Sequence, residues 1–218
     1  EFRRVLVRSV LAGFLADPRT QCVAVCDVDS KRRARAKQTV DAKNGNTDCT
    51  EYGDFRELLG RADVDVVAIS TPDHWHVPIA VRACEHGKDV YCEKPLSLTI
   101  RGARAAVTAA RRYDRVFQVG TQNRSNPAAL FGCEQIRQGR LGDHRFIEVN
   151  TWPISRPCNL PTEPVPPHVD WEMFLGPAPW RPFHSALHRP KGWIYYRDYS
   201  GGGTTDVGAH LYDLAQLA

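Results

Sequence analysis

The chain has 218 residues, 42% of them hydrophobic, which predicts a globular protein with one large domain or two small ones. The net charge of +4 is scattered in short basic clusters such as 31–33 and 111–112. We interpret these clusters as solvated helix faces, so no nucleic-acid partner is expected. No run of about 18 apolar residues occurs, so no membrane span is expected either.

The seven cysteines are odd in number and irregularly spaced, and Cys22, Cys26 and Cys92 fall in apolar, strand-like runs. This pattern predicts packed, reduced thiols and not a disulfide framework or a zinc site. The start of the sequence, EFRRVLVRSV, lacks the shape of a signal peptide. A cytoplasmic location is therefore favoured, with the periplasm as the alternative if an export signal lies upstream.

The first 120 residues alternate between apolar strands and amphipathic helices. After a first helix at 9–16, strands are predicted at 21–29, 64–70, 89–93 and 116–120, and further helices at 31–42, 77–85 and 99–113. Ser30 is the predicted N-cap of the helix at 31–42. This alternation predicts an α/β fold with a Rossmann-like, doubly wound parallel sheet, in which ligands bind outside the carboxyl ends of the strands.

The regular alternation of strands and helices ends after residue 120. A helix at 127–138, one strand at 145–152 and a glycine turn followed by a helix at 200–218 are predicted. Residues 153–200 are rich in proline and aromatic residues, which indicates an irregular but packed segment. One strand is too few for an independent sheet. We therefore expect an incomplete α/β (α+β) domain over 121–218, in a fragment truncated at both ends.

Asp27 ends the apolar run of the strand predicted at 21–29. In a dinucleotide-binding fold, an acid at this place accepts a hydrogen bond from the ribose 2′-hydroxyl and repels a 2′-phosphate, which favours NAD over NADP. The alternative is an acid that ends a strand and starts a turn. The G-x-G-x-x-G pattern is absent from residues 1–8, and Gly13 falls inside the first helix. We therefore predict that the first strand and the glycine-rich loop are lost or altered.

Two motifs follow strands at the predicted ligand edge. In TPDHWH, residues 71–76, two histidines suggest a metal, but no carboxylate or cysteine cluster completes a site, so we predict a cofactor-facing turn and no metal. In Glu93-Lys94-Pro95, a lysine beside a nicotinamide and a hydroxyl can donate or accept a proton, and Glu93 can orient it. The alternative is an exposed Glu–Lys pair at a helix start.

Asp206, His210 and Asp213 share one face of the predicted last helix. A histidine flanked by carboxylates suits a general base held in one tautomer. The alternative is a helix with one polar and one apolar face. The preceding glycines, 201–203, favour function because they allow the backbone to approach a ligand closely.

Taken together, VAVCDVD, ISTPDHWH, EKPLS, VGTQNRS, DWEMFLGPAPWRPF and GGGTTDVGAHLYDLAQ, in this order, resemble the Gfo/Idh/MocA oxidoreductase family. The resemblance implies an NAD(P)-binding Rossmann-like domain over 1–120 and part of a substrate domain over 121–218. It implies catalytic roles for Lys94, Asp206 and His210. It implies cofactor contacts for Asp27, Thr71, Pro72, His74, Glu93, Lys94 and Gln122.

The same resemblance implies a reaction and its partners. We expect hydride transfer between a nicotinamide cofactor, NAD, and a hydroxyl of a sugar, polyol or derivative. The full-length protein is expected to be a homo-oligomer. Two alternatives remain, an NAD-dependent glycosidase that oxidises its substrate only transiently, and an inactive, truncated family member.

Overall fold

The computed structural model describes residues 2–4 and 8–218, and its strands pair only in parallel within that part of the chain. The strands are β1 (Phe2–Arg4), β2 (Thr20–Cys22), β3 (Ala24–Cys26), β4 (Thr50–Tyr52), β5 (Val66–Ile69), β6 (Asp89–Glu93) and β7 (Phe117–Gly120). β1 pairs with β2, β3 pairs with β4, and β6 lies between β5 and β7. Only Val23 separates β2 from β3, and β1 also lies beside β5. The strands therefore follow the order 4-3/2-1-5-6-7.

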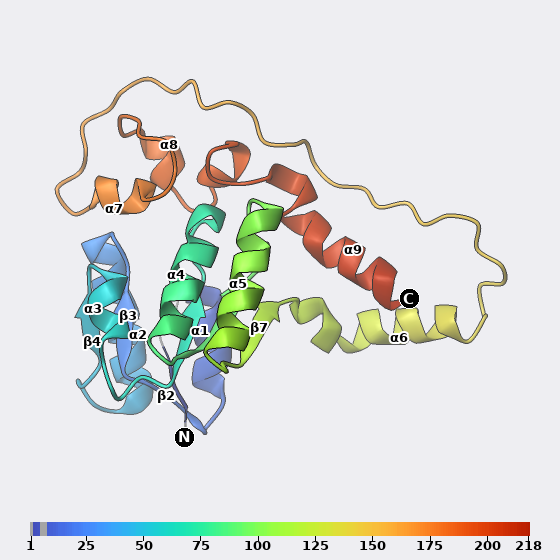
Figure 1. Cartoon of the computed structure of the whole chain (residues 1–218), viewed down its shortest axis with the longest axis horizontal. Helices are drawn as coiled ribbons and strands as arrows, with labels where there is room; N and C mark the ends of the chain where they lie inside the picture. Colours follow the sequence, from blue (N-terminus) through green and yellow to red (C-terminus); the bar gives the residue numbers. More distant parts are fainter. Residues whose placement is uncertain (1, 5–7) are drawn as a thin grey trace.

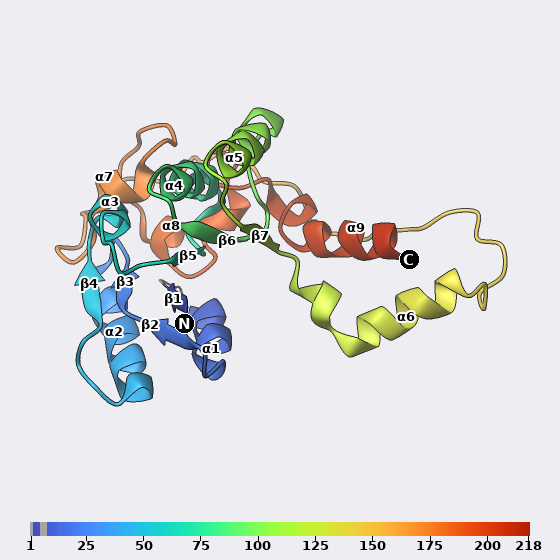
Figure 2. The same ribbon diagram turned by 60° about the horizontal axis from the view of Figure 1, so that its bottom comes forward.

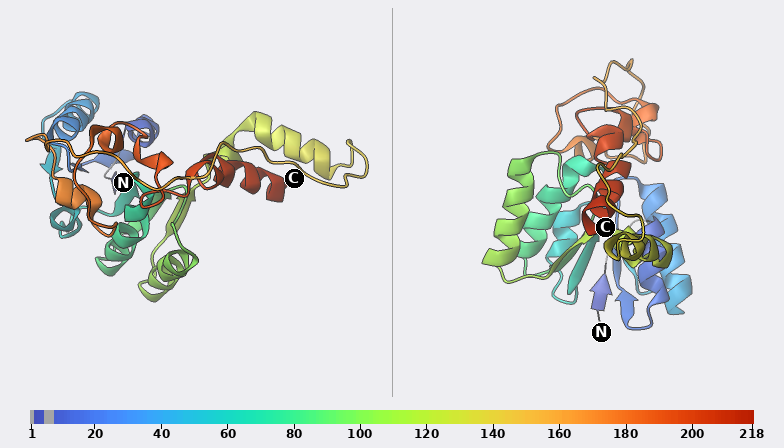
Figure 3. Two further views of the ribbon diagram at one scale, coloured as in Figure 1. Left: turned by 90° about the horizontal axis from the view of Figure 1, so that it is seen from above. Right: turned by 90° about the vertical axis from the view of Figure 1, so that its right-hand side faces the viewer.

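Helices cover both faces of these strands (Figures 1 and 2). On one face lie α1 (Arg8–Ala16) and α2 (Ser30–Asn44), and on the other lie α3 (Phe55–Leu59), α4 (Asp73–Glu85) and α5 (Ile100–Arg112). Figure 3 shows the strands between the two groups of helices. This arrangement confirms the predicted Rossmann-like, doubly wound fold.

Alternate side chains of β5 enter two different apolar clusters. Val67 and Ile69 pack with Ile79 and other buried side chains beneath α3, α4 and α5. Ala68, between them, packs on the opposite face with Leu11 of α1. Successive side chains of a strand point to opposite faces of the sheet. Because both faces of β5 are covered, every one of its side chains is buried, which is why β5 is an uninterrupted apolar run.

Several boundaries differ from the predictions. Asp29, and not Ser30, caps α2, because its side chain accepts hydrogen bonds from the backbone N–H groups of Lys31 and Arg32. α4 begins at Asp73 and not at 77, so the predicted turn at 73–76 is the first turn of a helix, where an acid is favoured by the helix dipole. β4 and α3 were not predicted.

The start of the chain bears on the predicted loss of the first strand and the glycine-rich loop. A three-residue strand, β1, is present and pairs with β2 in register, Arg3 opposite Gln21. The first strand is therefore short and not lost. Part of the stretch in which the loop was predicted to be altered, residues 5–7, lies outside the described residues.

The predicted strand at 145–152 is wrong. The structure gives these residues no ladder partner, and residues 141–148 are exposed. An extended segment becomes a strand only when a neighbour satisfies its backbone groups, and none lies beside it in the described part of the chain. Figure 1 shows the long segment between α6 (Pro127–Arg137) and α7 (Trp171–Leu175) crossing the molecule without helix or strand.

Most of the aromatic residues of 153–200 form a third core, while Trp180 and Tyr195 are exposed. Trp171, Phe174, Phe183, Tyr196 and Tyr199 are buried together around α7 and α8 (Ser185–His188), which confirms the predicted packing for the later part of this segment. Backbone hydrogen bonds attach it to the turn after β3. Ser30 donates to the His168 carbonyl at 2.9 Å, and Asp170 donates to the Val28 carbonyl at 3.0 Å.

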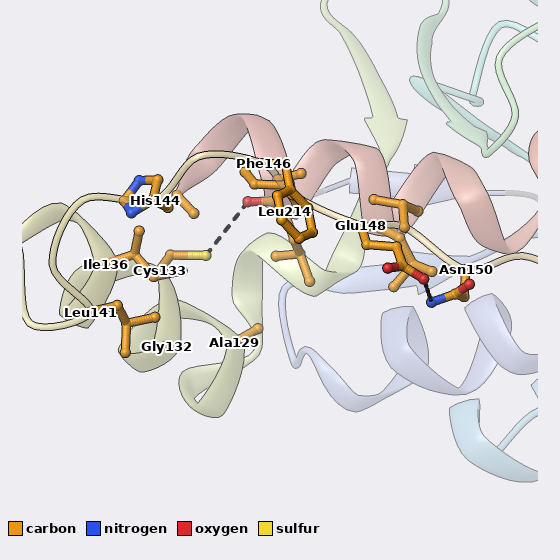
Figure 4. Close-up of a pocket in the computed structure, with 15 residues that line it drawn as sticks. Ala129, Gly132, Cys133, Ile136, Leu141, His144, Phe146, Glu148, Asn150 and Leu214 are labelled. Carbon is orange, nitrogen blue, oxygen red and sulfur yellow. Dashed lines mark hydrogen bonds between the residues drawn. The ribbon is translucent and has the colours of Figure 1, made fainter.

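α6 lies beside α9 (Val207–Leu217), and residues 141–150 run along both helices (Figure 4). Together they line a largely apolar groove of about 480 Å³. The Cys133 thiol lies 3.7 Å from the Leu214 carbonyl in this groove. No helix in the described part of the chain is long and apolar enough to cross a membrane.

Candidate active site

The carboxyl ends of β5 and β6 lie next to the start of α9, and an ion pair between Lys94 and Asp206 joins them. Lys94 follows β6 directly, and its peptide bond to Pro95 is cis. The Lys94 ammonium group donates to the carboxylate of Asp206, 112 residues later in the chain. Both side chains are mostly buried, with 16% and 13% of their surface exposed. The structure therefore brings together two of the three predicted catalytic residues.

His210 lies one helical turn beyond Asp206 on α9. Its Nδ1 atom is buried and has no hydrogen-bond partner among the described residues. Burial and the charge of Lys94 lower the pKa of His210, against the opposing charges of Glu93 and Asp206. The ring is therefore neutral at pH 7 and can accept a proton.

Asp213 does not complete a hydrogen-bonded triad with His210. Its carboxylate is bound by both arms of the Arg124 guanidinium, at 2.7 Å each. Arg124 belongs to η1 (Gln122–Ser125), the short turn that follows β7. The pair therefore fixes α9 against the loop after β7 and acts on His210 only through its charge.

A buried histidine joins the two turns of the site. The Nδ1 and Nε2 atoms of His76 lie 2.7 Å from the Pro95 carbonyl oxygen and 2.9 Å from the Thr71 carbonyl oxygen. Burial lowers the pKa of His76, and the neighbouring Lys94 lowers it further. His76 belongs to α4, and a neutral ring donates to only one of these two carbonyls at a time. The ring therefore lies between the turn after β5 and the turn after β6 and links them.

Asp73, which the sequence analysis left unassigned, is a further member of this site. It is 2% exposed, and its Oδ2 atom has no hydrogen-bond partner within residues 2–4 and 8–218. The pKa of Asp73 is raised to about 7, mainly by burial and also by the charge of Asp206. Ser200 and Lys94 act in the opposite direction and offset part of this rise. The strand register accounts for its position, because Ile69 lies opposite Cys92, which places the residues after β5 near Lys94.

Glu93 and Gln122 lie at an open pocket of about 520 Å³ between α1 and the ends of β6 and β7. Glu93 accepts hydrogen bonds from the Tyr91 hydroxyl at 3.1 Å and from the backbone N–H of Lys94 at 3.3 Å. Gly120 makes room for this carboxylate. A Cβ atom there would lie 2.8 Å from the Tyr91 hydroxyl and 2.9 Å from Glu93 Oε1.

Asp27 lies at the carboxyl end of β3, apart from the ion pair. Its carboxylate accepts the backbone N–H of Asp29 at 2.9 Å, and burial raises its pKa. The hydroxyls of Ser70 and Thr71, at the end of β5, are buried and have no partner among the described residues. These polar groups at the edges of β3 and β5 fit a ligand as polar as a dinucleotide.

His74 faces away from the pocket. Its Nε2 atom lies 2.9 Å from the Phe174 carbonyl, and its ring packs edge-on against Tyr199. Burial lowers its pKa to about 4. Trp75 is held in the same way, because its indole N–H donates to the carbonyls of Met173 and Phe174. His74 therefore joins α4 to the aromatic core, while Pro72 precedes the helix as its N-cap.

No three His, Cys, Asp or Glu side chains in the described ranges are grouped so that they could hold a metal ion. All seven cysteines are free, and five of them are buried. Burial raises the pKa of Cys26 to about 12, so this thiol stays protonated.

Comparison with known proteins assigns the chain to a family. Residues 7–121 match the Gfo/Idh/MocA description "Oxidoreductase family, NAD-binding Rossmann fold". Residues 150–218 match the family's C-terminal alpha/beta domain. The chain belongs to the Gfo/Idh/MocA oxidoreductase family. This confirms the predicted family, and the predicted cofactor, NAD, agrees with the family description.

Two curated relatives show different activities. A levoglucosan dehydrogenase of Pseudarthrobacter phenanthrenivorans is 36% identical over 164 residues, which are 75% of this chain and 35% of that protein. A glycosyl hydrolase family 109 protein of Shewanella sp. (strain W3-18-1) is 32% identical over 123 residues, which are 55% of this chain and 27% of that protein. The match thus spans about a third of the length of these relatives.

Among solved structures, an NAD-binding protein from Listeria innocua superposes with a TM-score of 0.66 at 23% identity. The superposition covers 99% of this chain and 52% of that one. At this identity the likeness shows the fold.

Proposed function

We propose that the protein containing this chain transfers a hydride between NAD and a hydroxyl of a sugar, polyol or derivative. The observation that carries the proposal is the buried pair of Lys94 and Asp206 at the carboxyl edge of the strands, where this fold binds its ligands. The similarity to a levoglucosan dehydrogenase supports a sugar-like substrate.

The residues at the edge suit this chemistry. Neutral His210, or Lys94, would remove the hydroxyl proton. Lys94 would then donate a hydrogen bond to the oxygen as it becomes a carbonyl, where the charge changes most during the reaction. Asp206 would hold the ammonium group of Lys94 in position for that step.

The cofactor would lie along the strand ends. Glu93 and Gln122 would line the pocket on the nicotinamide side, and Asp27 would accept the ribose hydroxyl. When bound there, NAD would supply the acceptor for the hydride that leaves the substrate carbon. The unpaired hydroxyls of Ser70 and Thr71 support a polar ligand at this edge.

Replacing Lys94 by methionine tests the proposal in the intact protein. Methionine keeps the length of the side chain and removes the proton and the charge. We expect the rate of NADH formation from levoglucosan, or from another sugar or polyol substrate, to fall by about 10²–10⁴-fold. NAD affinity, measured by calorimetry, should change little.

The Asp170→Asn variant is the matched control, because Asp170 is an exposed helix cap on α7. It should retain the activity of the wild type. Unchanged turnover in Lys94→Met would refute the assignment, and failure of the wild-type protein to bind NAD would favour an inactive family member.

A second candidate is an NAD-dependent glycosidase, which is favoured by the similarity to a glycosyl hydrolase family 109 protein. In such a reaction the oxidation is transient and the glycosidic bond is cleaved by elimination, so no net redox change occurs. Release of a sugar from a glycoside without accumulation of NADH would distinguish this candidate from a dehydrogenase.

A further inference from the structure

The first residue of α4 brings a second carboxylate to the Lys94–Asp206 ion pair. Asp73 is one of the few charged side chains that the structure buries almost completely. Its Oδ2 atom has no hydrogen-bond partner within the described ranges, and the nearby Ser200 hydroxyl lowers its pKa only in part. A buried carboxylate with an unpaired oxygen is costly to keep charged, so packing alone does not account for an acid at this position.

The charged and titratable groups around Asp73 come from three elements. Ile69 lies opposite Cys92 in the register of β5 and β6, so Asp73 lies on the same side of the sheet as Lys94, and the charges of Lys94 and Asp206 both act on its carboxylate. On α4 itself, His76 lies beside Lys94. The Lys94 ammonium group is bonded to Asp206 and forms no ion pair with Asp73, so a second buried carboxylate lies near an ammonium group that is already paired.

Such a cluster favours the binding of one extra proton. If both carboxylates are ionised, the three groups carry a net charge of −1 away from water. Protonation of one carboxylate removes this charge, and Asp206 is already paired with Lys94. The proton is therefore expected on Asp73, and the titration belongs to the cluster as a whole.

We propose that Asp73 is the proton store of the active site and exchanges its proton with Lys94 during each turnover. In oxidation, the Lys94 ammonium group turns from Asp206 toward Asp73, gives one proton to the Asp73 carboxylate and takes the hydroxyl proton of the substrate. The hydride leaves with two electrons for NAD, and the substrate oxygen becomes a carbonyl. The proton that alcohol oxidation releases ends on Asp73, and reduction runs the same transfers backwards.

This inference rests on the proposed function and adds a residue to it. Asp73 acts through Lys94 and does not contact the reacting atoms, so it is a positioning residue for the proton and not a catalytic one. The requirement for an ionised Asp73 predicts that kcat for oxidation rises with pH up to about pH 7 and then levels off.

The test compares wild type with Asp73→Asn, and with Asp170→Asn as the control, over pH 5.5 to 8.5 at intervals of about half a unit. Asparagine keeps the volume of the side chain and cannot exchange the proton. With NAD and the sugar substrate turned over by the wild type, levoglucosan being the first probe, Asp73→Asn should lose the rise in kcat below pH 7. At pH 8 its kcat should be lower by about tenfold or more, with KM changed by less than about twofold.

An unchanged pH profile in Asp73→Asn would overturn the proposal, and so would a uniform loss of activity with an altered KM. The failure of the proposed function is separately visible. If the wild type binds NAD but oxidises no sugar or polyol, the proposed function is refuted. Proton binding by Asp73 can still be measured in that case, because unfolding experiments need no turnover. Urea unfolding curves of wild type and Asp73→Asn that stay the same distance apart from pH 4 to 8 would show that Asp73 stores no proton.

Discussion

The Asp73→Asn variant separates the charge of this side chain from its shape. Burial raises the pKa of Asp73 to about 7, compared with 3.8 for an exposed aspartate. Each tenfold change in proton affinity corresponds to about 1.4 kcal/mol. The difference between the folded and unfolded states is therefore worth up to about 4 kcal/mol of unfolding free energy.

The sign follows from which state binds the proton more tightly. Between pH 4 and pH 7 the folded protein keeps the proton on Asp73, whereas the unfolded chain has lost it. The wild type therefore loses stability as the pH rises through that interval. Asp73→Asn lacks this loss. We expect similar stability of the two proteins near pH 4, and a variant more stable than wild type by up to about 4 kcal/mol at pH 8.

Urea unfolding followed by tryptophan fluorescence, repeated at each pH, measures this difference. The Asp170→Asn variant carries the same chemical change at an exposed helix cap, so its curve should run parallel to that of the wild type. A difference between Asp73→Asn and wild type that does not grow with pH would refute the assignment of a stored proton to Asp73.

Two further variants test other parts of the structure. Gly120→Ala places a methyl group against Tyr91 and Glu93, so the unfolding free energy should fall by about 1–3 kcal/mol in urea, and equal stability would mean that these side chains move aside freely. Tyr199→Phe removes a buried hydroxyl that has no partner in the described part of the chain, so thermal unfolding should show equal or slightly higher stability, by up to about 1 kcal/mol, and a clear loss would reveal a partner.

The sequence predicts β5, β6 and β7 well because each falls in a short apolar run next to a helix. β5, β6 and β7 lie where the runs at 64–70, 89–93 and 116–120 placed them. The segment at 145–152, RFIEVNTW, is rich in aromatic and β-branched residues and yet forms no strand. Local pattern specifies an extended backbone, and the partner that makes it a strand is a tertiary property.

The site could be predicted only in part, for the same reason. Motif order linked Lys94 to Asp206 through a family resemblance, although no local pattern connects residues so far apart. Asp73 was predicted as part of a turn. Pro72 followed by an acid is in fact typical of a helix start, but no local pattern indicates that this helix start is buried. The cofactor contact predicted for His74 is untested, but its ring is held by the Phe174 carbonyl in the aromatic core, and only the packing of that core reveals this.

The attachment of α4 to α7 has a consequence for how the sequence can change. The indole of Trp75 and the ring of His74 bind main-chain carbonyls of residues 173 and 174, so the contact survives substitution of the side chains that stand there. Gly176 is different, because a Cβ atom at that position would lie 1.9 Å from the Trp75 ring. Substitution is therefore tolerated at Met173, whereas Gly176 is constrained twice, by the Trp75 ring and by its positive φ of 46°.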